Sequence, residues 1–173
     1  MNFYQTLVKI ILLTTVFLLT TACSNASEES PGKVAQAITQ VLPVLDVYKR
    51  KSCGCCGKWV THINDNGFQT TVHNQEKLSE FKLSKNIEPE YHSCHTAVSK
   101  QGYVFEGHIP AKFIQQFLEQ EPKGAIGLAV PAMPMGSPGM EMNGMFFAYK
   151  VLLLKADGSS EVFAEVNAAE EQY

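Results

Sequence analysis

Hydrophobic positions along this chain change their period several times, and each change predicts a new secondary-structure element. Cys56, Val60 and Ile63 recur at the spacing of one helical face. Apolar and polar residues instead alternate over 68–72, as they do in a strand. The predicted elements are 41–48 (strand), 56–65 (helix), 68–72 (strand), 75–85 (helix), 96–106 (hairpin) and 110–121 (helix).

A second pattern follows the third helix and predicts a β extension. Phe146–Lys155 is an apolar strand, 156–159 is typical of a hairpin turn, and Glu161–Val166 supplies the partner strand. The last residues, Ala168–Tyr173, are expected to fray.

Five methionines fall within 13 residues ahead of this hairpin. Prolines and glycines are interleaved with them at a density that disfavours a helix, so the thioethers are expected on a loop. Thioether sulfur suits Cu(I), although methionine is also a common filler of irregular hydrophobic gaps. These residues are Met133, Met135, Met140, Met142 and Met145.

The order strand, helix, strand, helix, hairpin, helix is that of a thioredoxin-like domain. We therefore predict an α/β fold, with a thioredoxin-like core over 41–124 and a C-terminal β extension over 125–173 that carries the Met-rich loop. In such a fold the redox cysteines lie between a strand and the N-terminus of the next helix. Backbone N–H groups and the helix dipole favour thiolate over thiol at that position.

The N-terminus has the features of a bacterial export signal. One lysine precedes an apolar stretch that is too short to span a membrane. The small residues before Cys23 resemble a lipobox, so we expect a signal peptide over 1–22, lipidation of Cys23 and a polar tether over 23–40. The mature protein would be periplasmic and lipid-anchored to a membrane, the outer rather than the inner because Ser24 follows the cysteine. Cleavage elsewhere with a soluble product, and an uncleaved anchor, are the alternatives.

Charge argues against nucleic acid as a partner. The chain has 14 basic and 17 acidic residues, a net charge of −3, so it lacks the basic surplus typical of nucleic-acid binding.

Four cysteines remain once Cys23 is set aside, and three of them crowd one turn. Cys53, Cys55 and Cys56 follow the first strand and open the first helix. Two structural disulfides are one interpretation, but the three crowded thiols cannot all pair with Cys94. The other interpretations are metal ligation and thiol redox chemistry, because soft thiolates select Cu(I) and helix N-termini activate thiols.

Two distant residues are expected to join that turn. If Cys94 begins the strand beside the first one, it lies next to the cysteine turn, and the returning hairpin brings His108 to the same rim. His95 is a weaker ligand candidate than His108. It directly follows Cys94, and neighbouring residues of a strand point to opposite faces of the sheet.

Six short motifs occur in order between residues 44 and 141. They are KSCGCC (51–56), CHTA (94–97), EGHIPA (106–111), GLAVP (127–131), MP (133–134) and GSPGME (136–141). Together they resemble the bacterial DUF411 family and its copper-resistance members. The resemblance implies a periplasmic thioredoxin-like domain that binds copper at a multinuclear, cysteine-bridged site and interconverts Cu(I) and Cu(II) in detoxification. Ala132, Met135 and Met142 depart from the family pattern.

The candidate metal ligands combine thiolates, one imidazole and two thioethers. The two methionines are chosen because they lie within the family motifs. The candidates are Cys53, Cys55, Cys56, Cys94, His108, Met133 and Met140.

The first functional hypothesis is therefore a copper-binding protein, with copper ions and copper efflux components as its partners. A second is a thiol-disulfide oxidoreductase, since Cys53 and Cys56 also form a C-x-x-C motif. A third is a structural zinc site made of the same cysteines. Whether a copper site would turn over as an oxidoreductase or only store the metal is left open by the sequence.

Overall fold

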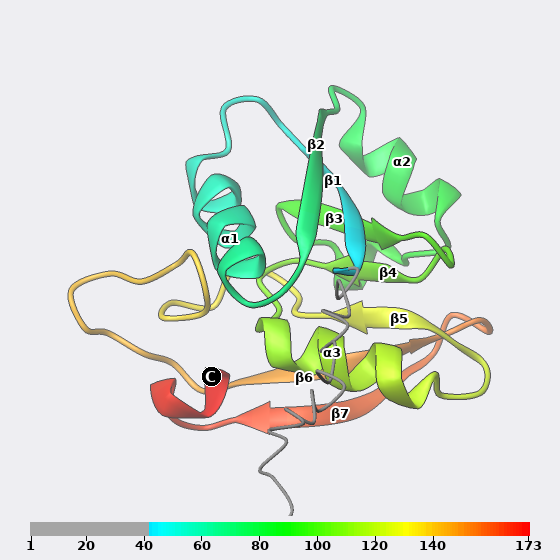
Figure 1. The fold of residues 1–173 in the computed structure, drawn as a ribbon. Coiled ribbons are helices and arrows are strands. Elements are labelled where there is room, and N and C mark those ends of the chain that lie inside the picture. Colours follow the sequence, from blue (N-terminus) through cyan, green and yellow to red (C-terminus); the bar gives the residue numbers. More distant parts are fainter. Residues whose placement is uncertain (1–41) are drawn as a thin grey trace, which may run out of the picture. The chain divides into compact units, whose positions relative to one another are not determined.

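Seven strands form one sheet, which is the framework of the structure (Figure 1). The computed structural model describes residues 42–173, so the expected signal peptide, the lipidation site Cys23 and the tether lie outside the described residues. None of the helices in this part of the chain has the length and apolarity needed to cross a membrane. In chain order the elements are β1 (Val44–Lys49), α1 (Gly54–Asp65), β2 (Gln69–Asn74), α2 (Leu78–Ser84), the 3-10 helix η1 (Pro89–Tyr91), β3 (His95–Ser99), β4 (Val104–Glu106), α3 (Ala111–Gln120), β5 (Ala125–Ala129), β6 (Tyr149–Lys155), β7 (Ser160–Val166) and the 3-10 helix η2 (Ala169–Gln172).

The strands lie in the order β2-β1-β3-β4-β5-β6-β7. β1 pairs in parallel with β2, while β3 runs antiparallel to both β1 and β4. The predicted order from the first strand to the third helix is confirmed. β5, which the sequence did not predict, pairs in parallel with β4 and antiparallel with β6. The C-terminal hairpin therefore continues the same sheet.

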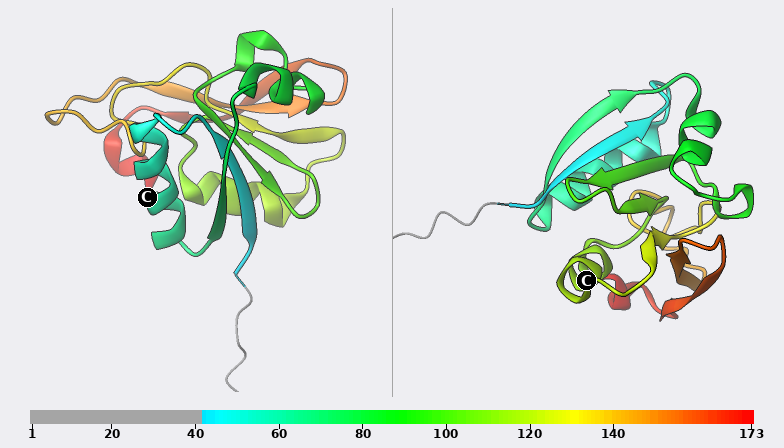
Figure 2. Two further views of the ribbon diagram at one scale, coloured as in Figure 1. Left: turned by 90° about the horizontal axis from the view of Figure 1, so that it is seen from above. Right: turned by 90° about the vertical axis from the view of Figure 1, so that its right-hand side faces the viewer.

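Helices cover both faces of the sheet (Figure 2). α1 and α3 lie on one face, where Trp59 of α1 and Phe117 of α3 belong to the same buried cluster as Leu45 of β1. α2 covers the other face, and its Phe81 stacks on Tyr48 at 4.1 Å between ring centroids. Because alternate residues of β1 face opposite layers, the strand is fixed from both sides before it ends at the cysteine turn.

The expectation of a frayed C-terminus was wrong. Gln172 is only 3% exposed, and its amide oxygen accepts a hydrogen bond from the Tyr149 hydroxyl at 2.7 Å. Its amide nitrogen donates to the Gly136 carbonyl at 3.0 Å. These bonds satisfy a buried polar side chain, and they tie the chain end to the long loop between β5 and β6 that carries the methionines.

Candidate metal centre

The cysteine turn lies between the end of β1 and the first turn of α1. Cys53 is the N-cap residue, and its sulfur accepts the Cys56 N–H at 3.4 Å. A disulfide joins Cys53 to Cys56, whereas Cys55 and Cys94 are free thiols. The N-cap sulfur takes the place that a serine or aspartate oxygen often has, so capping holds it against the positive end of the helix dipole.

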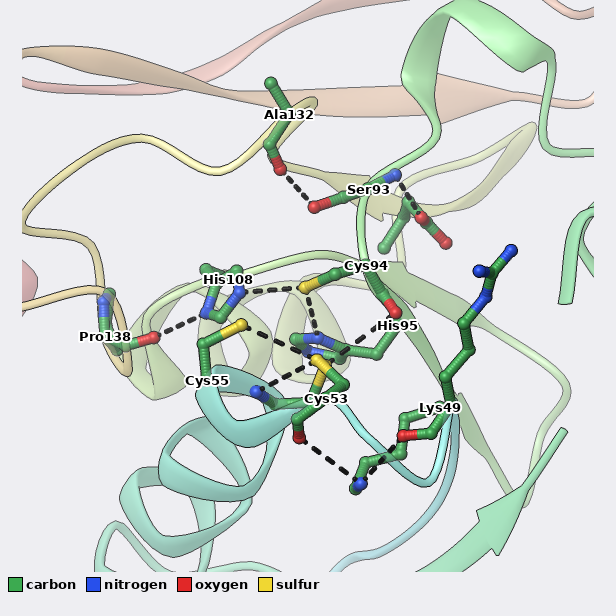
Figure 3. The surroundings of a disulfide bond; sticks show 12 residues. Lys49, Cys53, Cys55, Ser93, Cys94, His95, His108, Ala132 and Pro138 are labelled. Carbon is green, nitrogen blue, oxygen red and sulfur yellow. Dashed lines mark hydrogen bonds between the residues drawn. A yellow bond between two sulfur atoms is a disulfide. The ribbon is translucent and has the colours of Figure 1, made fainter.

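Four sulfurs converge at this helix end (Figure 3). Those of Cys53, Cys55, Cys56 and Cys94 all lie within 4.8 Å of one another, and Cys55 Sγ is 3.5 Å from Cys53 Sγ. Cys94 directly precedes β3, and β3 pairs with β1. Strand pairing therefore brings a thiol from 38 residues away to the cysteine turn.

His108 presents an unprotonated nitrogen to this sulfur group. Its Nδ1 lies 2.8 Å from the Pro138 carbonyl oxygen, and its Nε2 lies 2.9 Å from Cys94 Sγ. A carbonyl can only accept a hydrogen bond, so Nδ1 carries the proton and the Nε2 lone pair points at the thiol. Burial lowers the pKa of His108. The ring is thus held in the neutral form, and in the tautomer, that ligates metals.

His95 is closer to the site than strand alternation predicted. Its Nδ1 lies 3.3 Å from Cys94 Sγ, and its ring packs on Trp59 at 4.3 Å between centroids. The alternation argument fails because Cys94 lies outside β3, in a bend just before it. Burial, with a smaller effect from His108, lowers the pKa of His95 well below its usual value. The Nε2 of this buried ring has no hydrogen-bond partner within residues 42–173.

Cys94 belongs to two groups of donor atoms. One is the group of four sulfurs, and the other joins Cys94 to His95 and His108 within the same 4.8 Å limit. A group of soft sulfur donors and a group of mixed sulfur and imidazole donors therefore share the Cys94 thiol.

The methionine loop reaches the centre through its backbone. Pro138 accepts the His108 hydrogen bond, and a Cβ on Gly139 would lie only 2.8 Å from both the Cys55 carbonyl oxygen and the Trp59 nitrogen. Only glycine allows the loop to lie this close to α1. Met140 follows as a half-buried residue, whereas Met133, at the start of the loop, is 50% exposed.

A buried ion pair, which sequence reasoning missed, supports Cys94. Lys82 of α2 and Glu106 of β4 are 2% and 0% exposed and contact each other. The Glu106 carboxylate also accepts the Ser93 N–H and the Thr96 hydroxyl, each at 2.6 Å. The Lys82 ammonium donates to the Ser93 carbonyl at 2.9 Å. Both polar backbone groups of the residue before Cys94 are thus held by one ion pair.

A cavity of about 310 Å³ opens beside the sulfurs, with Arg50, Cys53, Lys82 and Cys94 in its wall. It gives a small reactant access to two of the four cysteines. A larger cavity of about 560 Å³ near Leu42 has no cysteine or histidine in its wall. Side-chain chemistry, rather than cavity size, therefore identifies the candidate site.

Iodoacetamide is expected to alkylate Cys94 slowly, with a rate that rises with pH. Burial, followed by the charge of Cys55, raises the pKa of Cys94 to about 12, and only the thiolate reacts. At about pH 8 the reaction should be roughly a thousandfold slower than that of an ordinary thiol, and it should accelerate about tenfold per pH unit up to about pH 10. Peptide mass spectrometry of Cys94 measures the rate. A rate that levels off near about pH 9 would contradict the raised pKa.

Comparisons with known proteins agree with this chemistry. The model of DUF411, a protein family of unknown function, matches residues 91–140, which include Cys94 and His108. Two solved structures, of copper resistance protein CopG in form 1 and form 2, are similar to this chain with 38% sequence identity and a TM-score of 0.69 each. Form 1 aligns over 74% of this chain and 100% of that chain, and form 2 over 73% and 99%. No curated protein matches the chain significantly.

Proposed function

The chain belongs to the DUF411 family, and we propose that it is a copper-resistance protein that binds copper at the cysteine centre. The observation that carries this proposal is the convergence of four sulfurs, one of which, Cys94 Sγ, lies against the unprotonated Nε2 of His108. Thiolate sulfur selects Cu(I), while imidazole also suits Cu(II). The donor set therefore fits copper in either oxidation state.

The position of Cys94 supports a further step, interconversion of Cu(I) and Cu(II). Its sulfur is shared by the sulfur group and the imidazole group, so a change in the preferred ligands requires little movement of the chain. His108 would be held ready by Pro138, which fixes its tautomer. The Cys94 thiol would give up its proton on binding, because metal ligation requires the thiolate.

The scaffold and location form part of the same proposal. A thioredoxin-like core is supported by the strand order β2-β1-β3-β4 and by the cysteines at the N-terminus of α1. Export, lipidation at Cys23 and anchoring at the outer membrane rest on the N-terminal sequence. Copper efflux components are the expected partners, since a periplasmic site would receive the copper that such systems export.

The proposal is tested by anaerobic Cu(I) titration of the fully reduced protein, in competition with the chelator bicinchoninate. We expect tight binding of more than one copper ion per chain, because two adjoining donor groups are present. X-ray absorption at the copper edge should show sulfur as the main ligand. Weak binding, or copper bound without sulfur ligands, would exclude the cysteine centre as the copper site.

Oxidation of the cysteine pair is expected to reduce copper loading. In the disulfide, Cys53 and Cys56 lack the thiolate charge that binds Cu(I) strongly, so only Cys55 and Cys94 remain as thiol donors. Protein with the disulfide intact and protein reduced with a phosphine should be loaded in parallel, then compared by metal analysis and thiol count. Equal copper content in the two samples would show that these two sulfurs are not ligands.

The disulfide itself favours a second candidate function, thiol-disulfide exchange. Cys53 and Cys56 are bonded at a helix N-terminus, where a thiolate leaving group is stabilised. In this case a dithiol substrate would reduce the pair and become a disulfide. Catalysed exchange should then disappear in Cys53→Ser and persist in Cys55→Ser. Retention of activity in Cys53→Ser would rule this function out.

A further inference from the structure

The loop between β5 and β6 contains a tight hairpin turn whose two flanking residues are methionines. Met142 and Met145 form an isolated antiparallel bridge, and the Met145 N–H donates to the Met142 carbonyl at 2.9 Å. The two residues between them, Asn143 and Gly144, have φ angles of +51° and +69°. An Asn-Gly pair with positive φ at both positions is the preferred two-residue hairpin connection. The turn is therefore specified locally by the sequence.

This geometry places two methionine side chains on the same face of the hairpin. Residues that face each other across an antiparallel bridge have Cβ atoms about 5 Å apart on the same face. Met142 is 50% exposed and Met145 is 42% exposed. Both line one cavity of about 140 Å³, together with Glu141. Met142 and Met145 are thus paired at the surface, which differs from the usual role of methionine as a core filler.

We propose that Met142 and Met145 form a separate Cu(I) site, which captures the ion and passes it to the cysteine centre. Two soft thioethers suit Cu(I) and discriminate against harder cations. Uncharged thioethers bind Cu(I) less tightly than thiolates do, so transfer toward the cysteines is downhill. The transfer part of this inference rests on the proposed function of the cysteine centre, whereas capture by the methionines does not.

The path between the two sites is short. Gly139 packs against the backbone of Cys55, and Met142 follows three residues later. Three residues span at most about 11 Å. Half-buried Met140 lies between them in the chain. The transfer is a ligand exchange without electron transfer, in which Cu(I) leaves two thioethers, binds cysteine sulfur and displaces the thiol proton to solvent.

The test uses the full reduced chain labelled with carbon-13 at the methionine methyl groups. Under anaerobic Cu(I) titration, the Met142 and Met145 methyl signals are expected to shift together once the cysteines are filled. In stopped-flow loading from Cu(I)-bicinchoninate, the Met142→Leu/Met145→Leu variant should load the cysteines about tenfold more slowly, because it lacks a tethered copper donor. Its final copper content at the cysteines should equal that of the wild type.

Phe147→Leu is the matched control, because Phe147 is a 60% exposed apolar residue of the same loop and has no donor atom. It should load at the wild-type rate. Methyl signals that stay unshifted at saturation, or a double variant that loads as fast as the wild type, would overturn the inference. If instead the two methyl groups shift while the cysteines bind no copper, the methionine site stands and the proposed function of the cysteine centre fails.

Discussion

Replacing Cys94 by serine is expected to lower the affinity of the centre for Cu(I) by at least about a hundredfold. Mutating a residue that only hydrogen-bonds to a metal ligand already lowers metal affinity about tenfold to a hundredfold, and Cys94 is itself a proposed ligand. Cys94 is the residue that the two donor groups share, so the substitution removes a ligand from both at once. A serine hydroxyl is a hard donor and does not replace a thiolate for Cu(I). Competition with bicinchoninate measures the affinity, and metal analysis measures the number of ions retained.

Cys55→Ser is the informative comparison. Cys55 belongs only to the sulfur group, so its loss leaves Cys94, His95 and His108 together. We expect Cys55→Ser to retain part of the copper and Cys94→Ser to lose nearly all of it, with both variants as stable as the wild type. If Cys94→Ser retains as much copper as Cys55→Ser, Cys94 is not a shared ligand.

The convergence at the centre could be predicted because it depends on topology. The change from strand to helix period predicted cysteines at the N-terminus of α1. The hairpin pattern predicted that Cys94 and His108 return to that end. In the structure Cys94 Sγ lies 2.9 Å from His108 Nε2. These inferences need only the strand order, which short-range hydrophobic periodicity and the connection lengths largely determine.

The missed features depend on contacts between distant residues. β5 is only five residues long, with Gly127 at φ +154°, and a Cβ there would overlap the Val104 carbonyl oxygen of β4. A short segment interrupted by glycine gives no strand periodicity. Likewise, a lysine on a short helix, such as Lys82, is normally expected to face solvent. Only the fold shows that Glu106, 24 residues later, lies opposite it. Periodicity cannot identify a buried ion pair whose partners come from different elements.

Substituting Lys82 by methionine is expected to destabilise the fold by about 3–5 kcal/mol, the usual cost of leaving one buried charge unpaired. Glu106 would keep its carboxylate in a fully buried position, with the Ser93 N–H and the Thr96 hydroxyl as its remaining partners. The Ser93 carbonyl would lose its bond to Lys82. Denaturant unfolding gives the free energy of unfolding, and the copper affinity of the folded fraction shows whether Cys94 has moved.

Two controls separate the buried charge from the loss of side-chain packing. Lys82→Met/Glu106→Gln removes both charges, so it should be more stable than Lys82→Met alone. Lys150→Met breaks a surface pair with Glu165, whose partners are 58% and 53% exposed, and should cost less than about 1 kcal/mol. If Lys82→Met is no more destabilising than Lys150→Met, the ion pair does not hold the Ser93–Cys94 segment. Suppose that Lys82→Met is less stable than the double variant and that both bind copper more weakly than the wild type. Charge pairing then stabilises the fold, and the bonds made by Lys82 and Glu106 hold Cys94 in position.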